Sequence, residues 1–296
     1  MAGHIPVLLK ESIELLMIKE GNTVVDATFG GGGHTVGILE SESTCVVTGV
    51  DRDNEAAQRA LEIKKKYPGR FSFLNMKFSE LCVPTKIDAI LFDFGISSFQ
   101  IDDASRGFSF THDGPLDMRM SSSTANTAPF LSANNISALE VVNTYSESDL
   151  SDIIYNYGNE KKARKIAKNI IKQRRLYKID TTFKLKSVID NVFGNKKVSK
   201  IENATRTFQA IRIYVNDELY EISNVLSRIP ELVKDGGRIV TISFHSLEDR
   251  IVKLWQKNNN VNIKPINNKV IKPSRDEIRS NPRSRSAVMR GFIYNE

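Results

Sequence analysis

The stretch VVDATFGGGGHTVG, Val24 to Gly37, decides the fold of this chain. A short apolar run ends in Asp26 and opens into four consecutive glycines, Gly30 to Gly33, which His34 follows. Glycine adopts positive φ readily and lets a ligand approach the backbone closely. Four glycines between a strand and a helix start leave room for a bulky ligand, so they predict a binding site at the carboxyl end of the strand.

A second acid strengthens this prediction. Asp51 closes the next apolar run, Val46 to Val50, and stands 18 residues after Gly33. A doubly wound α/β fold places its ribose-binding carboxylate at about this distance from the glycine turn. The order strand, glycine turn, helix, strand and acid therefore predicts a site for a cofactor that contains a nucleoside.

The residues around the turn favour one kind of cofactor. The glycines lack the spacing of the dinucleotide fingerprint, and His34 stands where a P-loop has lysine. Asp26 would repel a pyrophosphate but suits a cationic ligand with an amino group. S-adenosylmethionine carries a sulfonium and an ammonium group, and its ribose hydroxyls need an acceptor such as Asp51. The alternative is a glycine-rich surface turn without a ligand.

Length and composition limit the class of protein. The 296 residues allow one large domain or two. No apolar run approaches the roughly 18 residues of a membrane span, and Lys10 and Glu11 interrupt the N-terminal apolar segment, so we expect neither a membrane protein nor a signal peptide. Cys45 and Cys82 lack CxxC spacing, which argues against a disulfide framework or a metal site and favours a cytoplasmic protein.

The net charge of +7 is concentrated in two blocks. Nine Lys or Arg residues and no acid lie between Lys161 and Lys178, where apolar residues recur at helical spacing and predict a basic amphipathic helix. Eight more basic residues lie between Lys264 and Arg290. Two basic blocks favour nucleic acid as the partner, and solvated surface charge is the alternative. The expected RNA contacts are Lys161, Lys165, Lys168, Lys172, Arg283 and Arg285.

The order of expected elements predicts a parallel α/β sheet that a helical insertion interrupts. Expected strands cover 23–27, 46–51, 71–77, 89–94 and 238–244. Expected helices cover 54–67, 135–145, 148–157, 160–177, 182–193 and 205–229. We therefore expect a Rossmann-like domain of residues 1–104 and 211–296, and a helical, RNA-binding insertion of residues 105–210.

Two strand ends carry candidate catalytic groups. The strand in DAILFDFGISSFQ ends in Asp93, and Ser97 and Ser98 follow in a glycine turn. Methyl transfer to an exocyclic amine needs hydrogen-bond acceptors that orient the amine, and Asp93 is one. Carbon methylation of a pyrimidine would need a nucleophilic cysteine, which this turn lacks. In TISFHSLEDR, Ser246 is expected to cap a helix, and His245 is either catalytic or structural.

Several long blocks of sequence resemble the bacterial 16S ribosomal RNA cytosine-N4 methyltransferase (RsmH, or MraW) family. They include HIPVLLKE from His4, DATFGGGGHT from Asp26, DFGISSFQID from Asp93, GGRIVTISFHSLEDRIVK from Gly236 and NPRSRSAVMR from Asn281. The resemblance implies a class I methyltransferase domain with a helical insertion, S-adenosylmethionine as cofactor, and a decoding-centre cytidine of 16S rRNA or the small ribosomal subunit as target. It also implies cofactor positions at Gly32, Gly33, His34, Asp51, Phe78, Asp93 and Gln100, to which the charge argument above adds Asp26.

Three other functions stay open from the sequence. The target could be adenine N6 or a DNA cytosine; the chain could be a catalytically idle assembly factor that binds rRNA; or it could be a dinucleotide-dependent oxidoreductase. Intact acids at Asp26, Asp51 and Asp93 favour the enzyme over the idle factor. The sequence does not distinguish a monomer from a homodimer.

Overall fold

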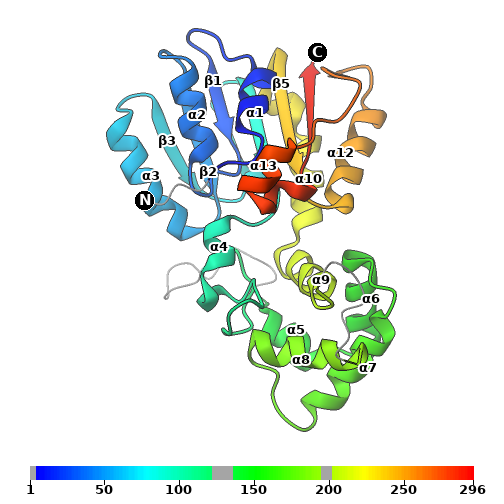
Figure 1. The fold of residues 1–296 in the computed structure, drawn as a ribbon. Helices are drawn as coiled ribbons and strands as arrows, with labels where there is room; N and C mark the ends of the chain where they lie inside the picture. Colours follow the sequence, from blue (N-terminus) through cyan, green and yellow to red (C-terminus); the bar gives the residue numbers. More distant parts are fainter. Residues whose placement is uncertain (1–4, 122–135, 195–201) are drawn as a thin grey trace. The chain divides into compact units, whose positions relative to one another are not determined.

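The computed structural model describes residues 5–121, 136–194 and 202–296 (Figure 1). The chain forms two compact units, Met1–Gly95 with Leu219–Glu296, and Ile96–Glu218. The expected domain limits, 104/105 and 210/211, lie inside the second unit. The reason is local packing, because Ile96 and Val215 both join the apolar core of the helical unit. Among the described residues, no helix has the length and apolar character that crossing a bilayer requires.

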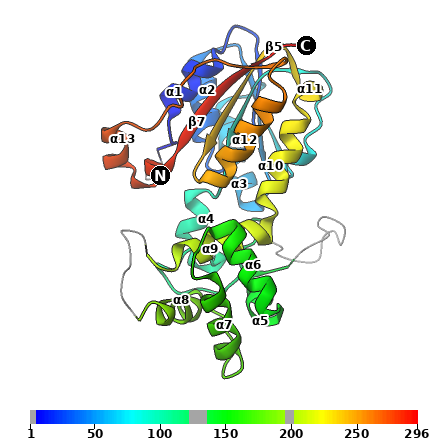
Figure 2. The ribbon, with the colours of Figure 1, turned by 90° about the vertical axis from the view of Figure 1, so that its right-hand side faces the viewer.

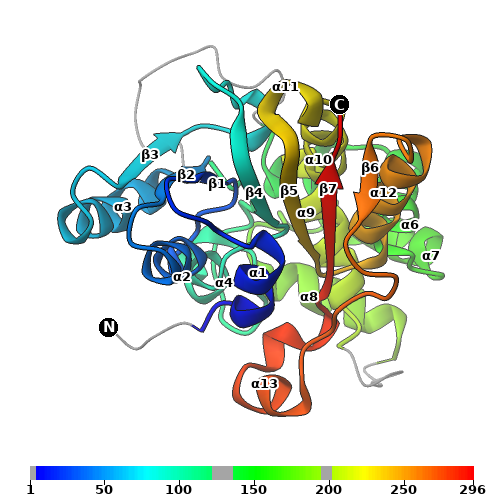
Figure 3. The same ribbon diagram turned by 90° about the horizontal axis from the view of Figure 1, so that it is seen from above.

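The first unit is built on a seven-stranded sheet with the order β3-β2-β1-β4-β5-β7-β6 (Figure 3). Neighbouring strands among β1 to β5 pair in parallel, and β7 is antiparallel to both β5 and β6. This arrangement confirms the predicted Rossmann-like sheet. The strands are β1 Thr23–Asp26, β2 Val46–Asp51, β3 Phe71–Asn75, β4 Ile87–Asp93, β5 Val233–Ser243, β6 Ile263–Pro265 and β7 Val288–Tyr294.

Helices cover both faces of the sheet, which explains why its central strands are apolar runs. Along β4, Ala89 and Leu91 face one core, whereas Ile90 and Phe92 face the other. The first core includes side chains of α1 (Leu9–Leu16), α2 (Gly33–Ser41) and α3 (Asn54–Lys66). The second includes side chains of α10 (Glu218–Ser227), α11 (Ile229–Leu232) and α12 (Ser246–Asn258), and Figure 2 shows α10 and α12 side by side. The short helix α13 (Arg275–Ser280) precedes β7.

The described elements of the second unit are helical. They are α4 (Ser98–Asp102), α5 (Ala138–Thr144), α6 (Glu147–Gly158), α7 (Ala163–Arg174), α8 (Thr182–Val192) and α9 (Thr205–Asn216), with the 3-10 turn η2 (Ala104–Arg106). The single helix expected over 205–229 is wrong. Asp217 adopts a left-handed φ of 52°, and its N–H donates to the carbonyls of Ile213 and Tyr214, which ends α9 before α10 begins.

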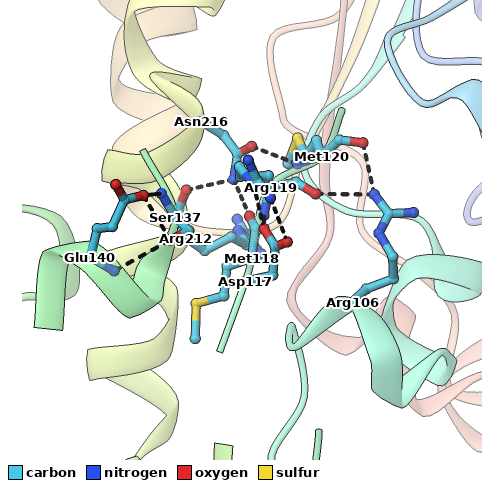
Figure 4. A network of polar contacts seen from close by, with 9 residues as sticks. All are labelled: Arg106, Asp117, Met118, Arg119, Met120, Ser137, Glu140, Arg212 and Asn216. Carbon is cyan, nitrogen blue, oxygen red and sulfur yellow. Dashed lines mark hydrogen bonds and ion pairs between the residues drawn. The ribbon is translucent and has the colours of Figure 1, made fainter. Parts of the chain in front are cut away.

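A polar network holds residues 106–120, which follow α4, in place (Figure 4). Arg106 donates to the carbonyls of Arg119 and Met120 at 3.0 and 2.8 Å. Asn216 accepts from the N–H of Met120 at 2.8 Å and donates to the carbonyl of Met118 at 2.7 Å. Met118 is fully buried with a left-handed φ of 60°, a conformation that persists only where its neighbours hold it.

Candidate cofactor site and nucleic-acid interface

The glycine turn between β1 and α2 is built on left-handed backbone. Gly30 and Gly32 have φ values of 51° and 77°. A Cβ at Gly32 would lie 2.3 Å from Ile63 Cδ1, and one at Gly33 would lie 2.5 Å from Pro6 Cγ. Packing within the protein therefore requires glycine at positions 32 and 33. The prediction from the sequence was different, namely that these glycines make room for a ligand. Any contact of these two residues with a cofactor stays a prediction.

Asp51 ends β2 and fixes the glycine turn. Its Oδ2 accepts a hydrogen bond from the N–H of Gly30 at 2.7 Å, and its Oδ1 accepts one from the N–H of Asp53 at 2.8 Å. Desolvation raises the pKa of Asp51 to about 6, although both hydrogen bonds act to lower it. Each carboxylate oxygen has a second lone pair, and the residue is only half-buried, so Asp51 can also accept from ribose hydroxyls.

Asp26 ends β1 and is fully buried. Its Oδ2 accepts from Thr35 Oγ1 at 2.7 Å, and its Oδ1 accepts from the N–H of Thr28 at 3.3 Å. Burial raises the pKa of Asp26 to about 6. The carboxyl group thus ties the strand end to the first turn of α2, and direct contact with a ligand stays a prediction.

Asp93 ends β4, next to β1 in the sheet. Its N–H donates to Thr28 Oγ1 at 2.6 Å, and its Oδ2 lies 3.8 Å from Nδ1 of His34. Its Oδ1 is buried and has no hydrogen-bond partner among the residues that the structure describes. Desolvation, and then the charges of Asp26 and Glu248, raise the pKa of Asp93 well above its usual range.

Sequence reasoning missed that Glu248 contributes to the surroundings of Asp93. Glu248 is fully buried in α12, and its Oε2 accepts from the N–H groups of Phe244 and His245 at 2.7 and 3.1 Å. The helix N-cap is His245, one residue before the expected Ser246, and its Nδ1 accepts from the N–H of Glu248 at 3.4 Å. His245 therefore has a structural task, and its catalytic role stays a prediction.

Ser97, Ser98 and Gln100 belong to α4 and its N-terminus. Ser97 Oγ accepts from the N–H of Gln100 at 3.2 Å, and Gln100 Oε1 accepts from the N–H of Ser97 at 3.0 Å. This is a capping box, which the S-x-x-Q spacing signals in the sequence. Ser98 is the first residue of the helix and is buried. Roles for these three residues in cofactor binding or catalysis stay predictions.

Phe78 lies in the 3-10 turn η1 (Phe78–Glu80), which follows β3. Its ring centroid lies 6.0 Å from that of Phe92 and 6.2 Å from that of Phe94. The side chains of the residues before and after Phe78 both donate to the carboxylate of Glu221 on α10. The half-buried ring is thus fixed near the carboxyl ends of the strands, where the predicted contact with adenine would be made.

One face of α7 carries exposed positive charge, whereas Ile166 and Ile170 on the other face are buried in the core of the helical unit. Within the described ranges, the lysines of the exposed face form no ion pair, unlike those of α8, where Lys184 and Lys186 pair with acids at 2.6 Å. Positive charge without a partner in the protein is available to a polyanion. We use the name α7 basic face for Lys165, Lys168 and Lys172 of this helix together with Lys161, which lies two residues before it.

Half of the basic residues in the second block lie on α13 and the 3-10 turn η3 (Pro282–Ser286) that follows it. Arg283 and Arg285 are exposed, and Ser284 between them is buried. Both guanidinium groups therefore stand at the surface of the first unit. Their contact with RNA stays a prediction.

Comparisons of the sequence with known proteins agree with the family resemblance. A family model described as the MraW methylase family matches residues 1–293. Ribosomal RNA small subunit methyltransferase H of Ehrlichia canis (strain Jake) is 44% identical over 305 residues, which cover 98% of this chain and 99% of that protein. The protein of the same name from Rickettsia typhi (strain ATCC VR-144 / Wilmington) is 44% identical over 309 residues, 97% of each chain. An rRNA methylase structure from Streptococcus thermophilus has a TM-score of 0.47 at 9% identity and covers 99% of this chain and 100% of that one.

Proposed function

Because this chain belongs to the MraW methylase family, we propose that it transfers a methyl group from S-adenosylmethionine to the exocyclic N4 amine of a decoding-centre cytidine in 16S rRNA. The observation that carries the site assignment is Asp93. Its buried Oδ1 has no hydrogen-bond partner among the described residues, at a strand end of an α/β sheet where ligands bind. An amine N–H is a donor that this oxygen can accept.

The acids at the strand ends fit the proposed donor. Asp26, Asp51 and Asp93 end three adjacent strands, and such a site suits a ligand with positive charge and hydroxyl donors better than a pyrophosphate. S-adenosylmethionine supplies a methyl group on a positively charged sulfonium. The residues proposed to hold it are Asp26, Gly32, Gly33, His34, Asp51, Phe78, Asp93 and Gln100.

The proposed reaction is direct and in line, without a covalent enzyme intermediate. The protein's task is to orient the amine and to stabilise the positive charge that develops on its nitrogen. Asp93 is suited to both through its carboxylate, with Ser97, Ser98 and His245 as further candidates. Cys45 is buried at the start of β2, at the opposite end of that strand from Asp51, where a nucleophile would be remote from this chemistry.

The α7 basic face and the pair Arg283 and Arg285 are the proposed RNA contacts. The support is their exposure, together with the absence of ion pairs at the α7 basic face within the described ranges. Such contacts to phosphates position the substrate without reading its sequence.

Nucleoside mass spectrometry of 16S rRNA from cells with and without this gene tests the proposed target. Loss of N4-methylcytidine alone is the expected result. Loss of an N6-methyladenosine would identify the other exocyclic amine as the target, and an unchanged set of modified nucleosides would favour the idle assembly factor.

Asp51→Asn should weaken S-adenosylmethionine binding about ten- to a hundredfold, because a hydrogen bond to a charged acceptor is worth roughly 1.5–3 kcal/mol. Isothermal titration calorimetry measures the dissociation constant of S-adenosylmethionine. A parallel titration with NAD tests the alternative of a dinucleotide-dependent oxidoreductase. Asp88→Asn is the matched control, because Asp88 also accepts a backbone N–H but stands at the start of β4. An unchanged dissociation constant in folded Asp51→Asn protein would limit Asp51 to holding the glycine turn.

A further inference from the structure

The segment before α1 links the C-terminal basic block to the candidate site. At one end, the N–H of Leu8 donates to Glu277 Oε1 of α13 at 2.8 Å. At the other, the carbonyl of Val7 lies 3.0 Å from His34 Nε2, and Pro6 packs directly on Gly33. The segment therefore touches α2 at both the imidazole and the backbone of the glycine turn.

This segment is also strained. Leu8 is 1% exposed and adopts a left-handed φ of 53°, a backbone conformation that is unfavourable for a bulky residue. Such a conformation persists only where surrounding contacts hold it, and the bond to Glu277 is one of them. The strain at Leu8 therefore indicates that the fold requires the backbone of Val7 and Leu8 to stay in this place.

The bond to Val7 selects the form of the imidazole. A carbonyl can only accept, so His34 Nε2 carries the hydrogen, and in the neutral ring Nδ1 is left with a lone pair. That Nδ1 faces Asp93 Oδ2 at 3.8 Å. Among the described residues, the acids Asp26 and Glu248 are the charged groups that raise the pKa of Asp93, and His34 is a basic side chain whose Nδ1 lies within 3.8 Å of its Oδ2.

We propose that His34 and Asp93 share the proton that methyl transfer releases, and that Glu277 is a positioning residue that holds His34 in the required tautomer through Leu8 and Val7. This proposal rests on the proposed function. The amine nitrogen uses its lone pair to form the new N–C bond, and the electron pair of the broken S–C bond stays on sulfur. The surplus N–H proton passes to Asp93, and His34 Nδ1 is the base that receives it before release to water.

The first test reads the tautomer directly and needs neither cofactor nor RNA. Nitrogen-15 NMR of the histidine rings distinguishes Nε2–H from Nδ1–H, and the spectrum of His34→Gln assigns the signals. His34 should be in the Nε2–H form in the wild type. Glu277→Ala should produce a mixture of both forms, whereas Glu277→Gln, which keeps an acceptor oxygen for Leu8, should restore the wild-type spectrum. A wild-type Nδ1–H form, or no change in Glu277→Ala, would overturn the proposal.

The second test separates proton transfer from cofactor binding. His34→Gln keeps a donor for Val7 but has no base, so turnover at saturating S-adenosylmethionine should fall about a hundredfold whatever the change in donor affinity. A weaker donor affinity with unchanged turnover would make His34 a cofactor ligand only and overturn the proposal. Absence of methyl transfer by wild-type protein would instead count against the proposed function and leave the NMR test decisive.

Discussion

Asp93→Asn should lower the turnover of methyl transfer by about 10²–10³-fold, because the amide keeps the shape of the side chain but loses the charge that stabilises the attacking amine. Asp93 stands at the end of β4 with a buried Oδ1 that has no partner among the described residues, so its carboxylate is available to the substrate. Tritiated methyl incorporation into small-subunit RNA at saturating donor measures the effect.

The same substitution should not destabilise the fold. Burial, and then the charges of Asp26 and Glu248, raise the pKa of Asp93 and disfavour its charged form, so the neutral amide should leave the free energy of unfolding unchanged or increase it at pH 7. Urea denaturation provides this control. Turnover within threefold of the wild type would remove Asp93 from catalysis and direct attention to Ser97, Ser98 and His245.

Replacing all four lysines of the α7 basic face by glutamine should weaken RNA binding by about 10²–10³-fold at 0.1 M salt. Each lost phosphate contact lowers the slope of log affinity against log salt by up to about 0.7–0.9, so the slope should flatten markedly. Glutamine has nearly the helix propensity of lysine, and α7 should therefore stay folded. Filter binding over a range of salt concentrations measures both quantities.

The double variant Lys184→Gln, Lys186→Gln is the control for this experiment. These lysines lie on the next helix, but Asp180 and Asp190 already pair with them, so their loss should change the salt slope little. S-adenosylmethionine affinity should stay at the wild-type value in both variants. If RNA affinity and slope survive in the fourfold variant, the α7 basic face is solvated surface and the helical unit has another purpose.

Local patterns were sufficient to predict the five parallel strands of the sheet, whereas the antiparallel strands β6 and β7 were not predicted. The strands that end in Asp26, Asp51 and Asp93 could be recognised in the sequence because buried parallel strands are apolar throughout. Their carboxyl ends meet at one edge of the sheet, so the three acids were expected near one another. The break between α9 and α10 was not predictable in this way. Asp217 ends α9 in a left-handed conformation. The helical spacing of apolar residues continues unchanged across Asp217, so the sequence pattern does not mark the break.

The surroundings of the site were less predictable than its strand ends. The influence of Glu248 on Asp93 and the packing of Pro6 on Gly33 join residues that are far apart in the chain, so no local spacing encodes them. The capping box of Ser97 and Gln100 was encoded locally, because S-x-x-Q is a helix-start pattern.

Reaction of the purified protein with small subunits from cells that lack this gene, with a trideuterated methyl donor, tests the central claim most directly. Mass spectrometry of the digested 16S rRNA should show a single labelled nucleoside, N4-methylcytidine, and Asp93→Asn protein should yield almost none. Label in any other nucleoside, or no label from protein that binds the donor, would contradict methylation of a 16S rRNA cytidine at N4.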